Sequence, residues 1–497
     1  MKKKISMAVM MHARSLFTGG ILFLGILVLL GGCSLAPKYI RPKAPIPDKW
    51  PQGKSYNSNH TKKGILQAEN KTSKRSRSSK DNVIMNWQNF FTDKNLKKII
   101  EISLKNNRDL RLATLSMERT RAMYGIKRTA LYPGVNISGR GIRQHLPANV
   151  SSTEKSTTTG QYSVNLGISS WEIDFFGRIR SLKQQALQEF LATDQARRSV
   201  QISLISQIGR TYLTLAADRE DLKLIKSTLD TEKNIYDLIL YQYRAGLANK
   251  LDLRRAQTQV DVAKGDLARY TQMTARDQNA LDFLAGTTLP ADLLPKNLDS
   301  ISHFKKNPPG ISSSVLLNRP DIMAAEHRLK GAYAFIGAAR AAFFPNIALT
   351  TGAGSASDEL SSLFKSGSGT WNFSTGITMP VFDPRIWEAL KVSKTDRKII
   401  LTQYEKTIQT AFREVADALA VRGTIDDRIS AQQSLTNALA ETYDLAKERY
   451  AKGIDSYLGV LDAQRSLYAA KKELIALCFA KSANQVKLYA VLGGGGK

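Results

Sequence analysis

Cys33 is the residue of this 497-residue chain that is best placed for covalent chemistry. It stands behind three consecutive lysines, Lys2 to Lys4, and an apolar run that ends at Leu30. A charged start, a short apolar run and small residues before a cleavage point form the pattern of an export signal. The run is shorter than most membrane-spanning helices. We therefore expect residues 1–32 to be a signal peptide and Cys33 to begin the mature chain.

The sequence Leu30-Gly31-Gly32-Cys33 resembles the lipobox of bacterial lipoprotein signals. That resemblance implies an S-linked diacylglycerol on the Cys33 thiol and an acyl group on its new amino end, and no other cofactor is expected. Several acyl chains anchor a protein firmly because each buried methylene contributes roughly 0.8 kcal/mol. Ser34 follows the cysteine in place of aspartate, which resembles the sorting signal for the outer membrane. The alternative is a buried cysteine after an ordinary anchor.

The other residue types that serve in active sites do not form a recognisable set. Cys478 is the second and last cysteine, and its apolar neighbours at 474–477 predict a buried structural thiol. The five histidines lack the spacing of metal ligands; they are His12, His60, His145, His303 and His327. No glycine-rich phosphate loop with lysine is present, and the glycines at 493–496 predict a flexible tail. We therefore expect neither an enzyme nor a metal site.

The net charge of +29 and the basic run at 71–80 raise the possibility of nucleic-acid binding. A chain exported behind a lipobox does not meet the genome, so we expect no nucleic-acid partner. The prolines from Pro37 to Pro51 favour extended backbone, and residues 54–80 are basic and rich in serine and asparagine. Residues 33–86 are therefore interpreted as a lipid-anchored tether and linker near anionic lipid surfaces.

The rest of the chain repeats itself. Four residues recur 207 positions later, so that Tyr243, Gly246, Ala256 and Gln257 correspond to Tyr450, Gly453, Ala463 and Gln464. The apolar residues around them recur in the same 3-4 spacing, which predicts helices that pack along their length. A repeat of about 200 residues is too long for a solenoid unit and indicates a duplicated domain. We assign residues 87–300 to the first structural repeat, 301–492 to the second and 493–497 to the tail.

Each repeat is expected to contain a helix, two strands and a long helical hairpin. In the first repeat a helical stretch is expected from about 99 to 131. Alternating apolar and polar residues predict strands near 135–140 and 162–169, and near 347–353 and 371–379 in the second repeat. This alternation fits a transmembrane β-strand and equally a soluble two-sided sheet.

Two segments without proline, 179–243 and 387–450, each predict one very long helix or two nearly collinear ones. Each is followed, after Gly246 or Gly453, by a helix of about 35 residues, far longer than the usual ~10–14 residues. Helices of this length need a bundle to bury their apolar seams. Four strands alone cannot close a membrane barrel, because known barrels begin at about eight strands and leave no backbone group unpaired. If the strands span a membrane, several chains must each contribute some of them.

The order of these elements behind a lipobox resembles the TolC-type outer-membrane efflux factors, in the lipoprotein branch that serves resistance-nodulation-division pumps. The similar segments are WQNFFTDKNLKKII (87–100), NNRDLRLA (106–113), WEIDFFGRIR (171–180), NRPDIMAAEHRL (318–329), ARAAFFPNIALTTGAG (339–354), AFREVADALA (411–420) and RYAKGIDSYLGVLDAQRSLY (449–468). The resemblance implies a mainly α-helical fold with a small transmembrane β part. It also implies a homotrimer with a helical tunnel and a shared twelve-stranded β-barrel, to which each chain gives four strands.

The implied function is a passive exit duct of a tripartite efflux system in the outer membrane, extending into the periplasm. The implied partners are a periplasmic adaptor, an inner-membrane efflux transporter and outer-membrane lipid. One alternative is the exit channel of a type I secretion system. A second is a lipid-anchored periplasmic scaffold whose hairpins bind envelope partners without forming a pore.

The turns between the long helices are the expected functional site. The resemblance implies that Asp252 and Tyr450 join neighbouring hairpins by a hydrogen bond that keeps the periplasmic entrance shut, a bond that contributes ~1.5–3 kcal/mol. The alternative is that Tyr450 is a packing residue and Asp252 a helix N-cap. The turn segments resemble the tips that meet the adaptor and pump, and their candidate residues are Arg244, Gly246, Leu247, Lys452, Gly453 and Ile454. Both glycines are expected in a left-handed, helix-ending conformation.

Asp455 and Asp462 are seven residues apart and therefore lie on nearly the same face of a helix. Around a symmetric pore each aspartate would form a ring of negative charge that favours cations. Asp462 also matches a position that faces the constriction in the family that the chain resembles. The alternatives are a solvated cap at Asp455 and an ordinary surface salt bridge at Asp462.

Overall fold

The computed structural model describes residues 34–56, 86–152, 154–301, 304–305 and 312–494. Contacts between residues divide the chain into two compact units. Unit 1 comprises the residues up to Pro42 together with Met117–Thr193 and Ala325–Tyr404. Unit 2 comprises Lys43–Ser116, Asp194–Ala324 and the residues from Glu405 onward. Each unit therefore combines segments from both sequence repeats, and each is described by itself.

The elements follow one another in the same order in both halves of the chain. The first half contains α3 (Trp87–Phe90), α4 (Lys94–Asn106), α5 (Arg108–Thr129), β1 (Val135–Leu146), β2 (Thr157–Glu172), α6 (Arg178–Arg244) and α7 (Lys250–Ala285). The second half contains α8 (Pro320–Ala341), β3 (Asn346–Ser357), β4 (Gly369–Thr378), α9 (Pro384–Ala451) and α10 (Tyr457–Val491). Short 3-10 turns lie at Ala291–Leu293, Ser313–Asn318 and Leu360–Ser362. The expected unit of helix, two strands and a long helical hairpin is confirmed in both halves.

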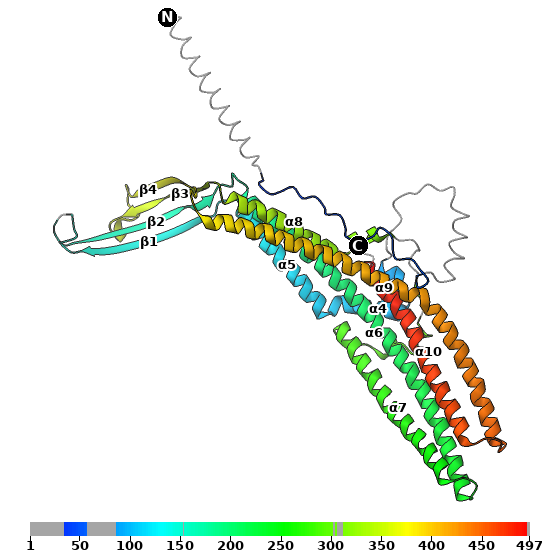
Figure 1. The fold of residues 1–497 in the computed structure, drawn as a ribbon. Helices are drawn as coiled ribbons and strands as arrows, with labels where there is room; N and C mark the ends of the chain where they lie inside the picture. Colours follow the sequence, from blue (N-terminus) through cyan, green and yellow to red (C-terminus); the bar gives the residue numbers. More distant parts are fainter. Residues whose placement is uncertain (1–33, 57–85, 153, 302–303, 306–311, 495–497) are drawn as a thin grey trace. The chain divides into compact units, whose positions relative to one another are not determined.

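Unit 1 contains one antiparallel sheet, which is built from a hairpin of each repeat. Its strand order is β1-β2-β3-β4, so the two hairpins are joined through the pairing of β2 with β3 (Figure 1). The strands β1 and β4 lie at the two edges of this sheet. Edge strands carry a row of backbone donors and acceptors that the sheet itself does not pair.

The register of the sheet separates apolar from polar side chains. Ile137 pairs with Leu166, which pairs with Ala353, which in turn pairs with Trp371. Because strand residues alternate between faces, these positions share one face with the other members of the alternation. Further apolar residues on that face are Val135, Val164, Ile347, Leu349, Phe373 and Ile377. The opposite face carries small and polar residues, among them Asn136, Ser138, Asn165, Gly352, Asn372 and Ser374.

The apolar face of the sheet is uncovered. Ile137 is 75% exposed, Trp371 79% and Ile377 70%. A contiguous exposed apolar surface of this kind marks a region that meets another protein or a membrane. The strands thus form a sheet with one apolar and one polar face, and the apolar face needs a partner.

The long helices agree closely with the predicted spans. The apolar seams expected from the 3-4 spacing are buried at nearly every position; the buried members are Leu253, Ala256, Val260, Ala263 and Tyr270 in α7, Tyr404, Ile408, Ala411, Val415 and Ala418 in α9, and Val460, Ala463, Leu467, Ala470 and Leu477 in α10. In unit 2 the hairpins α6–α7 and α9–α10 lie side by side, with both turns at the same end (Figure 1). Within the described ranges, none of the helices combines the length and the apolar character that a membrane crossing requires.

Three expectations about local structure need correction. The helical stretch from 99 to 131 is broken, because the Asn107 carboxamide caps α5 at the Leu110 N–H (2.9 Å) and donates to the Leu284 carbonyl oxygen (3.0 Å). Cys478 is a free, half-buried thiol rather than a fully buried one, and burial raises its pKa. Residues 34–56 contain neither helix nor strand, but they are not a free tether, because they pack on helices: in unit 2 the Trp50 ring stacks on Phe412 at 5.1 Å.

Substitution of two glycines tests the register between β2 and β3. A Cβ added at Gly167 on β2 would lie 2.2 Å from the Thr351 carbonyl oxygen on β3, whereas a Cβ at Gly376, its counterpart in the second repeat, would meet nothing within 4 Å. We expect Gly167→Val to weaken the pairing of β2 with β3 by at least the ~1–3 kcal/mol typical of overpacking. Gly376→Val is the matched control. Thermal melting followed by the β-sheet circular dichroism signal should show a lower midpoint only for Gly167→Val, and equal midpoints would contradict this register.

Candidate functional site: the turns of the helical hairpins

The two hairpin turns have the same backbone geometry. Gly246 and Gly453 both have left-handed conformations, with φ of 76° and 71°. The N–H of Leu247 donates to the Gln242 carbonyl oxygen at 2.8 Å, and the N–H of Ile454 donates to that of Arg449 at 3.0 Å. This bond closes a helix end when the preceding residue is left-handed, a conformation that glycine adopts without a steric penalty. The expectation of left-handed, helix-ending glycines at both turns agrees with this geometry.

The tips are exposed and stand on a small apolar core. Arg244, Gly246, Lys452 and Gly453 are exposed, and the two apolar tip residues are also open to solvent: Leu247 is 79% exposed and Ile454 58%. Beneath them, both hairpins contribute to one buried cluster, which consists of Ile239, Leu253, Ala256, Tyr457 and Val460. The core fixes the turns, while the tip side chains remain available to partners.

Tyr450 and Asp252 are not hydrogen-bonded to one another within the chain. The Tyr450 hydroxyl donates to Gln242 Oε1 at 3.1 Å, and therefore links α9 to α6. Burial and then the negative charge of Asp252 raise the pKa of the Tyr450 phenol. Asp252 lies in the first turn of α7 and pairs with Arg255 at 3.6 Å. The alternative of Asp252 as the N-cap is wrong, because Asn249 is the cap and accepts from the Asp252 N–H at 2.9 Å.

Asp455 and Asp462 differ in their electrostatic surroundings. Arg449 donates to both carboxylate oxygens of Asp455, at 2.5 and 3.2 Å, and this hydrogen bonding lowers the pKa of Asp455. Asp455 is not the helix cap either, since Ser456 occupies the N-cap of α10. Asp462 is exposed on α10 and forms no salt bridge with any described residue. The negative charge of Asp455 is therefore compensated locally, whereas that of Asp462 is not.

Comparison with known proteins places the chain in a family. A family model described as outer membrane efflux protein matches residues 99–287 and 311–494. The toluene efflux pump outer membrane protein TtgC of Pseudomonas putida is 44% identical over 469 residues, which are 94% of this chain and 93% of the relative. The chain belongs to the outer membrane efflux protein family.

Other relatives and solved structures also match this chain over nearly its whole length. The cation efflux system protein CusC of Escherichia coli is 38% identical over 474 residues, 95% of this chain and 98% of the relative. The structure of the open state of the MtrE outer membrane channel of Neisseria gonorrhoeae superposes with a TM-score of 0.79 at 35% identity and covers 94% of this chain and 99% of that one. The expected resemblance to outer-membrane efflux factors is confirmed.

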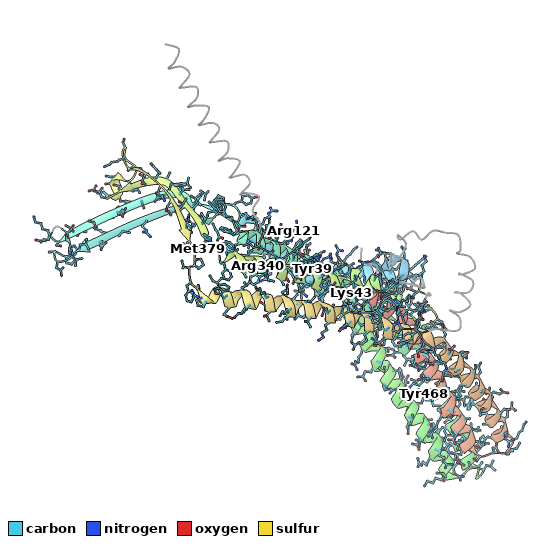
Figure 2. All side chains as sticks on the ribbon, turned by 45° about the horizontal axis from the view of Figure 1, so that its top comes forward. Tyr39, Lys43, Arg121, Arg340, Met379 and Tyr468 are labelled. Atoms are coloured by element: carbon cyan, nitrogen blue, oxygen red, sulfur yellow. The ribbon has the colours of Figure 1, made fainter. Side chains whose placement is uncertain are left out.

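Sequence reasoning missed a polar seam between the two hairpins of this outer membrane efflux protein. Arg465 Nε on α10 donates to Gln259 Oε1 on α7 at 3.1 Å, and the Tyr468 hydroxyl donates to Asp266 Oδ2 at 3.1 Å (Figure 2 labels Tyr468). A cavity of about 50 Å³ lies beside these bonds and is also lined by Glu232 and Gln464. In the sequence, only the recurrence of Gln464 in the repeat could have indicated this seam. The other residues of the seam occupy ordinary polar positions of a helix.

The seam holds carboxyl groups in an environment that disfavours their charge. Glu232 is 4% exposed, and burial raises its pKa to about 7 although Arg465 acts in the opposite direction. Burial likewise raises the pKa of Asp221 to about 6. Within the described part of the chain, no group of three or more His, Cys, Asp or Glu side chains is arranged to hold a metal ion. Cys33 lies outside the described residues.

The different surroundings of Asp455 and Asp462 predict different effects on the ion selectivity of this efflux protein when each charge is removed. If each aspartate forms a ring around a pore, Asp462→Asn should reduce the preference for cations markedly, because its charge is uncompensated. Asp455→Asn should have little effect, because Arg449 already offsets that charge. Reversal potentials in planar bilayers under a salt gradient check this, since a charged ring favours ions of opposite sign. A larger shift for Asp455→Asn than for Asp462→Asn would refute the assignment.

Proposed function

We propose that this outer membrane efflux protein is the passive exit channel of a tripartite efflux system. The protein is an outer-membrane channel protein and not an enzyme. Three copies of the chain would form a homotrimer that works with a periplasmic adaptor and an inner-membrane efflux transporter. Energy would come from the transporter, while this chain would supply the path.

The uncovered apolar face of the sheet, bounded by two open edges, is the observation that carries the proposal. In hydrocarbon each backbone donor and acceptor needs an internal partner, so a sheet with open edges can enter a membrane only when further strands close it. A second copy offers β4 to the open edge of β1, and three copies would give a closed barrel of twelve strands. The apolar face would meet lipid and the polar face, with Ser374 and Asn372, would line the lumen.

The relatives suggest that the channel itself is not the main filter for substrates. One relative is named for toluene and another for cations, although both match almost the whole of this chain. A duct that accepts such different cargo would leave selection to the transporter and adaptor. We therefore assign the exported molecules to the partners rather than to residues of the duct.

The tip residues would serve two roles in such a channel. Asp252 and Tyr450 would hold the entrance narrow, with the bond formed between neighbouring hairpins of the trimer. The exposed tip residues Leu247 and Ile454, with Arg244 and Lys452 beside them, would meet the adaptor. Support for the first role is the position of both residues beside the hairpin turns, with Tyr450 in the last turn of α9 and Asp252 in the first turn of α7.

The gate has a direct test in Tyr450→Phe, which removes the hydroxyl and keeps the ring that packs against Tyr457 at 5.8 Å. In the closed trimer the Tyr450 hydroxyl would donate to the Asp252 carboxylate in place of Gln242 Oε1. A bond to a charged acceptor contributes about 1.5–3 kcal/mol, so its loss should raise single-channel conductance or the time spent open. Recordings in planar bilayers measure both quantities. Tyr443→Phe is the control, because Tyr443 lies on the same helix outside the tip. Unchanged recordings for Tyr450→Phe would remove this residue from the gate.

The membrane position of the sheet is tested by charge on its two faces. Ile377→Arg places a cation on the apolar face of β4, where a charge facing lipid costs about 2–4 kcal/mol at the middle of the bilayer. Ser374→Arg, on the polar face of the same strand, is the matched control. We expect Ile377→Arg to lose the heat-resistant oligomer and conductance, and Ser374→Arg to keep the oligomer. Equal assembly of both variants would favour the periplasmic scaffold instead.

A further inference from the structure

The cavity in the polar seam is lined by three buried side chains with polar atoms that lack a hydrogen-bond partner among the described residues. Glu232 on α6 is 4% exposed, Gln259 on α7 7% and Gln464 on α10 8%. The unpaired atoms are Glu232 Oε2, Gln259 Nε2 and Gln464 Oε1. Buried polar groups in folded proteins are almost always hydrogen-bonded, so three unpaired atoms around one cavity indicate a bound polar ligand.

Bonds across the seam set the orientation of the cavity wall. Arg465 Nε on α10 donates to Gln259 Oε1 at 3.1 Å, which leaves Nε2 as the unpaired end of the Gln259 carboxamide. Beside it the Tyr468 hydroxyl, labelled in Figure 2, donates to Asp266 Oδ2 at 3.1 Å, and both of these residues also line the cavity. The wall therefore presents one amide donor and two acceptor oxygens to the same space.

The size and the chemistry of the cavity fit water. Its volume is about 50 Å³, and roughly 10–15 Å³ is needed to hold one water molecule, so there is room for about three. A water molecule can accept from the Gln259 amide and donate to Gln464 or Glu232, which joins helices that have no direct bond between these atoms. A metal cation fits less well, because the positively charged Arg465 lines the same cavity.

Glu232 is the residue of this wall that can exchange a proton. Burial raises its pKa to about 7, and Arg465 on α10 acts in the opposite direction. Its titratable neighbours are Tyr457 on α10 and Tyr443 on α9, whose pKa values are raised first by burial and then by the Glu232 charge, and Asp266 on α7, which lines the same cavity. Neutral Glu232 can donate its proton to a bridging water, whereas the charged form can only accept.

The second repeat shows that the helix does not need a carboxyl group at this position. The shift of 207 positions that relates the two hairpin turns places Leu439 of α9 at the position of Glu232. The same shift places Asn437 at the position of Asp230. An apolar residue is thus compatible with the long helix, so packing alone does not account for Glu232.

We propose that Glu232 and the water molecules that bridge it to Gln259 and Gln464 form a proton-binding site, and that loss of the proton weakens the seam between α6, α7 and α10. The released proton passes to the bridging water and from there to solvent. The negative charge that remains on Glu232 attracts Arg465, and a guanidinium that moves toward Glu232 no longer holds Gln259. The seam lies within one chain, so this inference goes beyond the exit channel and does not rest on it.

The direction of the pH effect follows from the pKa of Glu232 in the closed and the opened seam. In an opened, hydrated seam the pKa has its ordinary value of 4.5, and in the closed seam it is about 7. Between these two values the closed seam binds more protons than the opened one, so low pH stabilises it. This stabilisation is complete below about pH 4.5 and is lost as the pH rises through about 7.

Hydrogen–deuterium exchange of the full-length protein in detergent measures the opening of the seam. Exchange in peptides from residues 225–240 and 457–468 is followed at about pH 5.5 and about pH 7.5, on either side of the pKa of Glu232 in the closed seam. The rates are corrected for the intrinsic pH dependence of amide exchange. We expect the equilibrium constant for opening to rise on the order of tenfold more in the wild type than in Glu232→Gln, which has no proton to lose.

The variants separate Glu232 from other carboxyl groups of the same hairpin. Burial also raises the pKa values of Asp218, Asp221 and Asp277, but these residues are present in both proteins, so the difference belongs to Glu232. Asp230→Asn removes an exposed carboxylate from the same helix and should behave as the wild type. Glu232→Leu introduces the residue of the second repeat and should behave as Glu232→Gln. An equal rise in the wild type and Glu232→Gln, or a rise that Asp230→Asn also abolishes, would overturn the proposal.

A high-resolution crystal structure of the full-length protein tests the ligand itself. The crystals are grown at the lower pH and soaked in a thallium(I) salt, because thallium(I) occupies sites for monovalent cations and gives an anomalous signal. We expect ordered water within hydrogen-bond distance of Gln259 Nε2 and Gln464 Oε1, and no anomalous peak in the cavity. A thallium peak would identify a cation site, and a cavity free of density would exclude a bound ligand; either result contradicts the proposal.

Discussion

The unpaired backbone edges of β1 and β4 are the constraint on which the rest of the structure depends. An edge strand leaves N–H and C=O groups without partners, and in hydrocarbon each such group costs several kcal/mol. The uncovered apolar face, with Ile137 and Ile377 more than two-thirds exposed, prevents the alternative of leaving the sheet in water at no cost. Pairing β1 of one copy with β4 of the next removes both edges together and needs no change within the chain. The symmetry that closes the sheet then applies to every other element, so each tip residue recurs once in every copy.

The hairpin bundle shows a different balance between stability and motion. A wall of long helices could be held by apolar seams alone, as the buried residues of α7 and α10 show. Here the two repeats are also joined by single hydrogen bonds, from Arg465 to Gln259 and from Tyr468 to Asp266, each with a net contribution of only about 0.5–1.5 kcal/mol, or up to ~3 where a group is charged. Burial of Glu232 beside them raises its pKa, so the folded state disfavours the charged form of this carboxyl group. Bonds of this strength can exchange without unfolding either helix.

The sequence predicted those features that depend on local pattern and missed those that depend on tertiary contacts. The long helices were predictable because 179–243 and 387–450 contain no proline, and the strands because apolar and polar residues alternate. The break at Asn107 was not, because its side chain is held by the carbonyl oxygen of Leu284, far away in the sequence. Asp252 was a plausible cap, yet Asn249 takes that role three residues earlier. The bond from the Tyr450 hydroxyl to Gln242 depends on which helices become neighbours, and no spacing in the chain encodes that.

The duplication also sets a limit on how partners can recognise the tips. The two turns share their left-handed glycine, their closing hydrogen bond and an exposed apolar residue, Leu247 or Ile454. They differ in charge. In the second turn Arg449 neutralises Asp455. In the first turn Gln242 stands at the position of Arg449, and Asp252 pairs instead with Arg255, one turn into α7. In a trimer this gives six turns with nearly the same backbone but only three with identical side chains. A partner that contacts all six turns must bind the features that they share, the glycine turns and the apolar tips. A partner that recognises the charged side chains is restricted to alternate hairpins.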